Sequence, residues 1–413
     1  MTKRIVVTGI GASSALGGTA EENWKNLLAG VSGTHTLTHD WVEQYQLPVT
    51  FAAEASVRPT DVLPRHEAKR LDPSTQFALI VAREAWEDAG SPDVAPERLG
   101  IDWATGIGGV WTLLDAWDTL REKGPRRVMP LTVPMLMPNA GAGNLSLHFG
   151  AKAFARTVVS ACASSTESIG NAYEHLQAGL ADVVIAGGAE SAIHPITMAS
   201  FASAQALSKR NDSPETASRP GAIDRDGFVM GEGGAAVVLE TEEHAKARGA
   251  RIYAYLVGAG VTADSYHITG NDPEGRGAAR AVELALEQAG ASADEVTHIN
   301  AHATSTPVGD PNEYNALKNV FGDRLDEIPV SATKASTGHL LGGTGALEAV
   351  YTILALRDRI APPTINMTEP DPEVPFRLSG EAQPLGDAPQ LAISNSFGFG
   401  GHNAVVAFRS YDG

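Results

Sequence analysis

Short apolar segments rich in β-branched residues alternate along this chain with longer segments of helical character. The strand-like segments are residues 4–8, 157–160, 183–186, 235–239, 252–257, 297–300, 329–331 and 404–408. The helix-like segments are residues 74–89, 166–178, 277–289 and 345–355. Such alternation is typical of α/β proteins, and strands that lack a polar face belong to sheets covered on both sides. The sequence therefore predicts an α/β fold with buried sheets.

A charged segment at residues 240–250 marks the predicted division of the chain. Its acidic and basic residues end in glycine, which favours an exposed helix with a glycine stop. We therefore place a boundary near residue 250, with an N-terminal half over 1–250 and a C-terminal half over 251–413. A length of 413 residues fits one large domain or two fused ones, and 43% hydrophobic residues can form a sizeable core.

Charge and the length of the apolar segments exclude several classes of function. The chain has 49 acidic and 31 basic residues, which argues against nucleic acid as a general partner. No apolar run approaches the roughly 20 residues that span a bilayer, and we expect neither a membrane anchor nor a signal peptide. A single cysteine excludes an intrachain disulfide, so a reducing, cytoplasmic location is expected.

The glycine-rich segment after the first predicted strand matches a dinucleotide-binding loop only in part. Thr8-Gly9-Ile10-Gly11 begins as that fingerprint does, but Ser14 stands where its third glycine belongs. No acidic residue ends a second strand about twenty positions further on, as that fold requires. We therefore expect no nucleotide cofactor. The glycines at 106–109 and 398–401 are interpreted as points of close backbone approach.

The only cysteine, Cys162, follows a β-branched strand end and precedes a helix-like segment. A thiol at a helix N-terminus faces free backbone N–H groups, which favour the thiolate. The alternative is a buried, unreactive cysteine that packs as a small apolar side chain. The residues around Cys162 leave both interpretations open.

Two histidines far downstream favour the reactive interpretation. His302 precedes a turn rich in hydroxyl groups, and His339 lies in a loop of small residues. Neither has helical spacing on an apolar face, and loops at strand ends commonly present functional groups. Lys334 adds a cation able to shift the pKa of a neighbouring imidazole. These three residues and Cys162 are the candidate catalytic group.

Four motifs in order resemble those of the elongating β-ketoacyl-[acyl-carrier-protein] synthases, nearest to the synthase II type. They are Ser160-Ala161-Cys162-Ala163-Ser164, Asn300-Ala301-His302-Ala303-Thr304-Ser305-Thr306, Lys334 with Thr337-Gly338-His339, and Asn395-Ser396-Phe397-Gly398-Phe399-Gly400-Gly401. The similarity covers essentially the whole chain, and Ala303 with His402 resembles the actinobacterial branch. The resemblance implies a thiolase-like fold, in which two similar halves form a five-layered αβαβα sandwich.

The resemblance also implies a decarboxylative condensation in two half-reactions. Cys162 would accept an acyl group from acyl carrier protein, and His302 and His339 would donate hydrogen bonds to the enolate formed from malonyl carrier protein. Lys334 would fix the histidine tautomers, supported by Glu348 and by Asp310 and Glu313 behind His302. An ordinary buried ion-pair network is the alternative for these carboxylates. The backbone N–H groups of Cys162 and Phe399 would bind the acyl-transfer oxyanion.

Further residues receive roles only through the resemblance. Phe399 would gate the nucleophile and Phe228 would pack near the reacting carbons, while Ile107 and Phe201 would line the acyl tunnel. Core packing is the alternative for all four. Thr304 and Thr306 would hold the phosphopantetheine arm. Three basic pairs would receive the acidic carrier protein, or else are solvated surface charge: Lys69 with Arg70, Arg126 with Arg127, and Lys209 with Arg210.

Several alternatives stay open at this point. A polyketide ketosynthase paired with a chain-length factor uses the same chemistry. A cysteine hydrolase would use Cys162 with one histidine, and an inactive carrier-binding scaffold would need neither the cysteine nor the histidines.

The family also implies a homodimer, with residues 133–139 near its interface, and no metal or redox cofactor. One departure concerns substrate range, because Gly221-Ala222 stand where the family usually has Phe-Asp. This change is expected to loosen a loop or enlarge a pocket.

Overall fold

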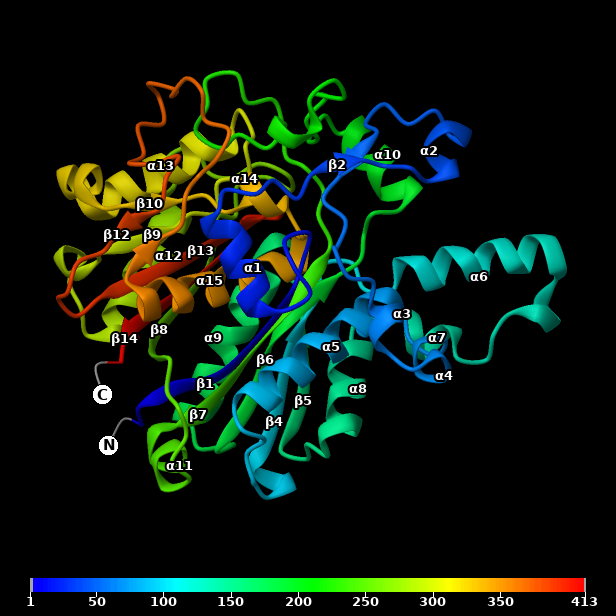
Figure 1. Ribbon diagram of the computed structural model, residues 1–413, viewed down its shortest axis with the longest axis horizontal. Coiled ribbons are helices and arrows are strands. Elements are labelled where there is room, and N and C mark those ends of the chain that lie inside the picture. The colour runs from blue at the N-terminus through cyan, green and yellow to red at the C-terminus, as the bar shows by residue number, and fades with distance from the viewer. Residues whose placement is uncertain (1–2, 412–413) are drawn as a thin grey trace.

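A computed structural model describes residues 3–411, and within them one mixed ten-stranded sheet organises the fold (Figure 1). Its strands are β1 (Ile5–Ser13), β4 (Leu99–Ala104), β5 (Phe154–Val158), β6 (Val183–Glu190), β7 (Gly233–Thr241), β8 (Ala254–Ala263), β9 (His298–Asn300), β10 (Val330–Ser331), β13 (Leu391–Gly398) and β14 (His402–Ser410). Two small ribbons pair β2 (His35–Thr36) with β3 (Phe51–Ala52) and β11 (Ile360–Ala361) with β12 (Gln383–Pro384).

The two ends of the large sheet repeat one pattern. The strand order is β5-β4-β6-β7-β1 in the N-terminal half and β10-β9-β13-β14-β8 in the C-terminal half. In each half the first two neighbouring pairs are parallel and the last two are antiparallel. β1 joins the halves, because it pairs antiparallel with both β7 and β8. The expected duplication is therefore present in strand order and direction.

The helices fall into long and short groups. The long ones are α1 (Ala20–Leu28), α5 (Pro73–Asp88), α6 (Val110–Lys123), α8 (Ala140–Phe149), α9 (Ser164–Gln177), α10 (Pro195–Ser203), α12 (Arg276–Ala289), α13 (Gly309–Phe321) and α15 (Thr344–Asp358). The short ones are α2 (Asp40–Gln44), α3 (Pro59–Val62), α4 (Arg65–Ala68), α7 (Thr132–Leu136), α11 (Glu242–Ala247) and α14 (Lys334–Thr337). Short 3₁₀ turns are η1 (Pro96–Arg98), η2 (Pro125–Arg127), η3 (Ala161–Ala163), η4 (Pro214–Thr216), η5 (Ala293–Glu295), η6 (Gly322–Glu327) and η7 (Leu341–Gly343).

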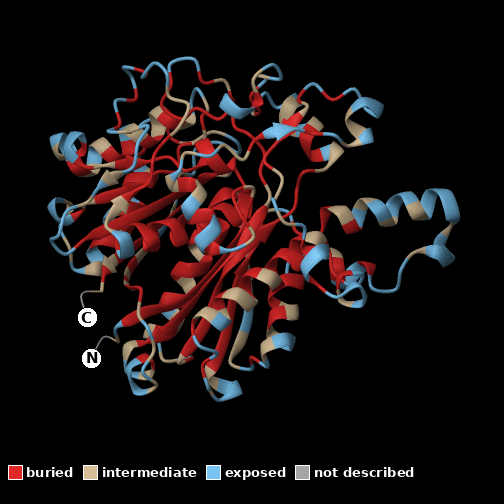
Figure 2. Cartoon of the chain, viewed as in Figure 1, coloured by how far each residue is buried: buried red, intermediate tan, exposed pale blue. Residues whose placement is uncertain are grey.

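Five layers result from the way these helices cover the sheet. α9 and α15 lie at the centre and contact strands of both halves, among them β6 and β14. α5 and α8 cover the outer face of the N-terminal half, and α12, with α13 packed on it, covers the C-terminal half. Almost every residue of α15 is buried, as a helix between the two halves of the sheet requires (Figure 2). The expected αβαβα sandwich is confirmed.

The glycines of β1 explain why the partial dinucleotide pattern occurs there. A Cβ atom at Gly9 would lie 2.1 Å from the backbone oxygen of Ala85, and one at Gly11 would lie 2.1 Å from that of Val81. Both acceptors belong to α5, so these glycines let the helix pack directly on the strand. The segment is the middle of a buried strand and forms no loop.

Most predicted elements match the structure. All eight predicted strands correspond to observed ones, although β1 and β8 are longer and β5 lies a few residues earlier than expected. The four predicted helices correspond to α5, α9, α12 and α15, and the charged segment forms α11, followed by Gly249 at φ +68°. β4 and β13 were not predicted. The boundary near residue 250 lies between α11 and β8 and stays a prediction.

Within residues 3–411, none of the helices combines the length and the apolar character that a membrane span requires.

Candidate active site

Cys162 lies where β5 gives way to α9. The turn η3 carries it, and Ala161, directly before it, has φ +51°, an unusual conformation for a residue with a Cβ atom. Such strain persists only where surrounding structure holds it, and here Ser164 does so by accepting the backbone N–H of Ser160. Cys162 is therefore buried at the N-terminal end of α9, as the sequence predicts.

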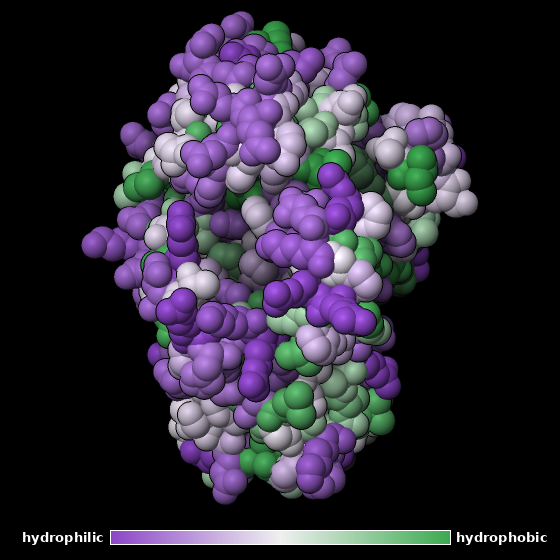
Figure 3. Space-filling view, turned by 90° about the vertical axis from the view of Figure 1, so that its right-hand side faces the viewer, coloured by the Kyte–Doolittle hydropathy of each residue, from purple (hydrophilic) through white to green (hydrophobic). Residues whose placement is uncertain are grey.

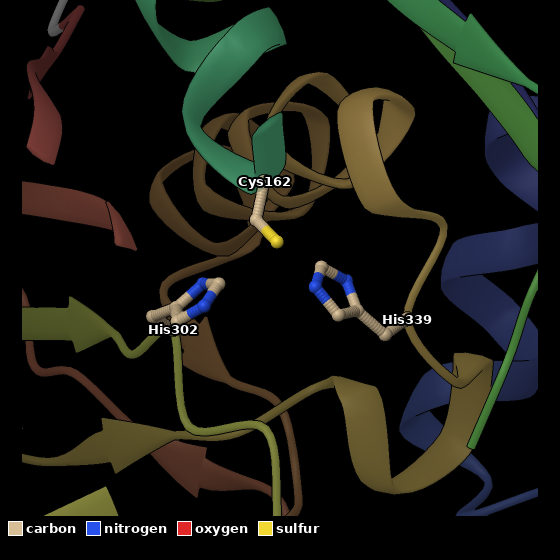
Figure 4. Close-up of side chains that lie close together, drawn as sticks. All are labelled: Cys162, His302 and His339. Atoms are coloured by element: carbon tan, nitrogen blue, oxygen red, sulfur yellow. The ribbon is translucent and has the colours of Figure 1, made fainter. Parts of the chain in front are cut away.

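The two predicted histidines meet this cysteine. His302 follows β9, and His339 lies between α14 and η7. Their ring centroids are 5.5 Å apart and the rings are nearly perpendicular. The sulfur of Cys162 points toward the space between the rings (Figure 4). This sulfur and one nitrogen of each ring all lie within 4.8 Å of one another, so the fold assembles the predicted group from three distant segments.

Both imidazoles are neutral at ordinary pH. Burial holds the pKa of His302 and of His339 well below the usual value, and the positive charge of Lys334 lowers both further. Nδ1 of His339 lies 2.9 Å from the hydroxyl of Thr344, while its Nε2 has no hydrogen-bond partner within the described chain. Thr344 was not predicted, because it is simply the first residue of a helix and no local pattern distinguishes it.

The expected thiolate is corrected by the structure. Burial raises the pKa of the Cys162 thiol to about 11, against the opposing effects of Lys334 and of the backbone N–H groups of Phe399 and Cys162. A helix end favours an anion by at most about 2 kcal/mol, which does not offset the loss of water around a buried charge. Cys162 is therefore a thiol whose anionic form is stabilised by two backbone donors.

Lys334 contacts the backbone of His302, not either imidazole ring. Its ammonium donates to the carbonyl oxygen of His302 and lies 2.6 Å from a carboxylate oxygen of Glu348. Both side chains are buried, and burial raises the pKa of Glu348 to about 7 although Lys334 opposes the shift. The expectation that Lys334 fixes a histidine tautomer directly is wrong. It anchors the His302 loop.

The two carboxylates expected behind His302 have separate places. Glu313 accepts the backbone N–H groups of His302 and Ala303 at 2.8 and 2.6 Å. Asp310 does not contact His302, because it accepts the backbone N–H groups of Ser305 and Gly221 instead. Glu313 therefore holds the catalytic loop, as predicted, while Asp310 supports the neighbouring turn.

A cavity of about 480 Å³ opens above the catalytic group. All of the predicted pocket residues line it, namely Ile107, Phe201, Phe228, Thr304, Thr306 and Phe399. The Phe228 ring packs edge-on against His339 with centroids 5.4 Å apart, and Phe201 packs in the same way against Phe228 at 5.3 Å. Core packing alone is therefore not the whole account of these side chains, since each also faces the cavity.

Thr304 and Phe399 lie on different parts of this cavity wall. The hydroxyls of Thr304 and Thr306 are 3.0 Å apart, so they form one polar strip on the wall. Phe399 is 40% exposed and stands before Gly400 and Gly401, both at positive φ. Phe399 therefore stands partly exposed on the cavity wall, and its role as a gate stays a prediction.

The Gly221-Ala222 segment forms a closed turn outside the cavity lining. Gly221 has φ +75°, and its carbonyl accepts the backbone N–H of Asp371. A Cβ atom there would lie 2.6 Å from Cδ1 of Leu378. Ala222 is buried, and Arg225 beyond it pairs with Asp371 at 2.5 Å. The turn is closed in this structure, and the effect of Gly221-Ala222 on loop or pocket stays a prediction.

The predicted carrier-protein contacts lie on two surface regions. Lys69 and Arg70 follow α4, and Arg126 and Arg127 belong to η2 at the outer end of α6; all four are exposed. This side of the molecule faces the viewer in Figure 3, where hydrophilic side chains predominate and hydrophobic ones interrupt them. Lys209 is exposed, but Arg210 is tied to Asp224 at 2.9 Å.

The residues that could hold a metal ion are those of the catalytic group itself. Cys162, His302 and His339 are the only set of three such side chains with converging ligand atoms in residues 3–411. The same convergence serves a nucleophile flanked by two hydrogen-bond donors. The expectation of no metal or other cofactor stays a prediction.

Comparison with known proteins agrees with this geometry. The model of the β-ketoacyl synthase N-terminal domain matches residues 2–245, and that of the C-terminal domain matches residues 253–368. A 3-oxoacyl-[acyl-carrier-protein] synthase 2 of Staphylococcus aureus (strain N315) is 45% identical over 414 residues, covering 99% of each chain. The enzyme of the same name from Synechocystis is 43% identical over 99% of this chain and 98% of its own.

Solved structures share the fold. A type II polyketide synthase acyl-carrier protein in complex with its ketosynthase has a matching chain with a TM-score of 0.91 at 31% identity, covering all of both chains. A β-ketoacyl synthase from Burkholderia phymatum has a TM-score of 0.89 at 36% identity, covering 99% of this chain and 100% of that one. The catalytic geometry, both domain models and the full-length relatives agree that the chain belongs to the β-ketoacyl synthase family.

Proposed function

We propose that this β-ketoacyl synthase elongates acyl chains carried on acyl carrier protein, with Cys162 as its nucleophile. The observation that carries the proposal is the convergence of the Cys162 sulfur with two neutral imidazoles inside one cavity. The full-length relatives named 3-oxoacyl-[acyl-carrier-protein] synthase 2 support this substrate class. Fatty acid synthesis is the proposed pathway.

In the first half-reaction, the Cys162 sulfur attacks the carbonyl carbon of the acyl thioester. The bond from that carbon to the carrier's pantetheine sulfur breaks, and the thiol proton of Cys162 passes to the leaving sulfur. Because the Cys162 thiol is protonated at neutral pH, a neutral imidazole beside it accepts this proton in transit. The backbone N–H groups of Cys162 and Phe399, which stabilise negative charge on the sulfur, would bind the oxyanion.

In the second half-reaction, the malonyl thioester loses carbon dioxide and leaves an enolate. Its oxygen carries the negative charge and would accept hydrogen bonds from His302 and His339. The hydroxyl of Thr344 at Nδ1 of His339 supports a proton on Nε2 of that ring. The enolate carbon then attacks the acyl group on Cys162, the carbon–sulfur bond breaks, and the thiolate takes up a proton. Both half-reactions conserve oxidation state, so no redox cofactor is required.

Access and partner recognition follow from the cavity wall and the surface. Phe399 would gate the nucleophile, Ile107 and Phe201 would contact the acyl chain, and the Thr304–Thr306 strip would hold the amides of the pantetheine arm. A carrier protein is acidic, so the exposed cations at Lys69, Arg70, Arg126 and Arg127 would receive it, together with Lys209 and Arg210. The neighbouring structure of a ketosynthase with its acyl-carrier protein supports this kind of partner.

A homodimer is part of the proposal. β5 lies at the end of the sheet order, so it is an edge strand with free backbone groups. Elsewhere on the surface, α6 and α7 expose large apolar side chains, including Trp117 and Val133 at 54% and 60% exposure. A second copy would cover both features.

For an enzyme of this pathway we expect a cytoplasmic location.

The nearest alternative is a polyketide ketosynthase that acts with a chain-length factor. One structural neighbour is the ketosynthase of a type II polyketide synthase at 31% identity, and another is the ishigamide ketosynthase/chain length factor at 30%. The synthase 2 relatives are more similar at 45%, which favours fatty acid elongation. A cysteine hydrolase would need water as acceptor and only one histidine, and an inactive scaffold would need neither, so the two convergent imidazoles favour the synthase over both.

Intact mass spectrometry tests the proposal. The enzyme is incubated with acyl carrier proteins that carry acyl chains of graded length, with Cys162→Ala as the control. A single acyl adduct on the wild type, absent from the variant, is expected, followed by loss of the adduct when malonyl carrier protein is added. No adduct at any length would contradict the proposed function.

A further inference from the structure

Glu190 is a buried carboxylate beside the cavity that the proposed chemistry does not use. It is the last residue of β6 and has no solvent exposure. All four of its hydrogen-bond donors within the described chain are uncharged groups. Burial raises the pKa of this carboxyl to about 7, although the four hydrogen bonds oppose the shift. A buried carboxylate without a cationic partner is costly, so its presence calls for a specific explanation.

The carboxylate joins two segments that come from different halves of the chain. Oε1 accepts the Thr105 hydroxyl at 3.0 Å and the backbone N–H of Ile107 at 3.2 Å. Oε2 accepts the backbone N–H groups of Gly106 at 2.6 Å and Gly342 at 3.1 Å. The first three donors follow β4 in the N-terminal half, whereas Gly342 belongs to η7 in the C-terminal half.

Both segments form walls of the cavity. Gly106, Ile107 and Leu341 line it, and Leu341 stands two residues after His339. The segments touch so closely that a Cβ atom on Gly342 would lie 2.1 Å from the backbone nitrogen of Gly106. Leu341 is held at φ +48°, a strained conformation for a side chain of its kind. The acyl-contacting wall and the His339 loop therefore meet at the Glu190 carboxylate.

We propose that Glu190 is a positioning residue that fixes the Ile107 wall relative to the His339 loop and thereby selects the acyl chain lengths that reach Cys162. The inference rests on the proposed function, since it concerns the acyl chains of that reaction. A carboxylate suits this task because both of its oxygens accept hydrogen bonds. A glutamine offers only one such oxygen, and its amide NH₂ would face N–H donors and release one of the two segments.

Single-turnover acylation with carrier proteins of graded acyl length tests the assignment. Glu190→Gln is compared with wild type and with Glu84→Gln. Glu84 is a matched control, because it has a carboxyl pKa raised to about 7 by burial and accepts backbone N–H groups only, from Ala12 and Ala20. We expect Glu190→Gln to change the ratio of long-chain to short-chain acylation rates by about tenfold, since a buried donor is left unpaired. Glu84→Gln should keep the wild-type ratio.

Thr105 supplies a milder variant that leaves Glu190 in place. Thr105→Val removes one of the four donors together with the acceptor of the Gly108 N–H, and Thr105→Ser keeps both hydrogen bonds. A smaller change of the ratio in the same direction is expected for the valine variant, with wild-type behaviour for serine. If Glu190→Gln does not fold, this pair still decides the question.

Alkylation of Cys162 reports the charge near the thiol, whereas the acyl-length ratio is the readout that a purely structural role would not move. The negative charge of Glu190 raises the pKa of the Cys162 thiol, whereas the positive charge of Lys334 lowers it. Glu190→Gln should therefore shift the alkylation profile to lower pH. Unchanged length ratios in both Glu190→Gln and Thr105→Val would overturn the assignment. Failure of the wild type to form any acyl adduct would instead contradict the proposed function.

Discussion

The hydroxyl of Thr344 lies 2.9 Å from Nδ1 of His339, at the point where α15 begins. A hydroxyl that donates to Nδ1 leaves the single imidazole proton on Nε2, the nitrogen that has no protein partner in the described chain. Burial keeps the ring neutral, so only this arrangement places an N–H toward the cavity. With Thr344 as the donor, the first turn of a central helix would place the proton on the nitrogen that the proposed enolate stabilisation needs.

Replacing Thr344 tests this relationship. Thr344→Val keeps the shape of the side chain and removes the donor, so the malonyl decarboxylation rate should fall about tenfold to a hundredfold. Thr344→Ser restores the hydroxyl and should recover the rate. Acylation of Cys162 should change little in both variants. Release of carbon dioxide from malonyl carrier protein measures the first effect, and equal rates in valine and serine variants would contradict the tautomer argument.

The sequence was sufficient for the catalytic group and insufficient for what positions it. Cys162, His302 and His339 stand in local motifs whose residue types signal chemistry. Thr344 and Glu190 act through contacts with residues 5 to 152 positions away, and only the folded chain reveals such contacts. The sequence also does not predict β4 and β13, although it predicts their neighbours in the sheet.

The charge state of Cys162 shows why local reasoning failed in one case. The helix N-terminus was identified correctly, but its effect on an anion is small beside that of complete burial. Burial is a property of the packed layers and not of the motif. The contact of Lys334 is likewise set by packing. Sequence spacing does not reveal that its ammonium reaches the His302 carbonyl.

The thiol pKa predicts how alkylation depends on pH. Because burial raises the pKa of Cys162 to about 11, the fraction of thiolate should still increase above pH 9. The rate of reaction with iodoacetamide should therefore rise throughout pH 7 to 10 with no plateau. Cys162 is the only cysteine, so Cys162→Ala gives the blank. A plateau reached near pH 8 would show that the anion is stabilised more strongly than this burial allows.

His339 is predicted to serve decarboxylation more than acyl transfer. His339→Ala removes a donor to the enolate oxygen, and loss of one such donor costs about a hundredfold to a thousandfold in rate. Acyl-adduct formation on Cys162 should remain measurable, because the backbone N–H groups near the sulfur are retained. Mass spectrometry of the adduct and carbon dioxide release separate the two steps. Unimpaired decarboxylation in this variant would refute the enolate role.

The Lys334–Glu348 pair predicts a specific pattern of stability. Lys334→Met leaves a buried carboxylate without its cation, which should lower the free energy of unfolding by about 3–5 kcal/mol. Lys334→Met combined with Glu348→Gln removes both charges and should recover much of that loss. Chemical denaturation of the two single variants and the double variant gives the coupling. The 2.6 Å separation of the two groups indicates that their effects on stability are coupled. If the loss in the double variant equals the sum of the two single losses, that coupling is absent.

The turn at Gly221 is predicted to resist any side chain. Gly221→Ala meets two penalties, because φ is +75° and the new Cβ atom would lie 2.6 Å from Leu378. Gly249→Ala is a matched control, since Gly249 has φ +68° but no atom near the position of a Cβ. The control should lose only the conformational part of about 1 kcal/mol, whereas Gly221→Ala should lose about 1–3 kcal/mol more through overpacking.

Chemical denaturation of both alanine variants measures that difference. Neither glycine lines the cavity, so cavity shape should stay unchanged and the acyl-length profile should follow wild type as long as the protein is folded. Equal losses of stability in the two variants would mean that Leu378 moves aside without cost. A changed length profile in Gly221→Ala alone would show instead that this turn communicates with the pocket, through Asp310 and the Ser305 backbone that it holds.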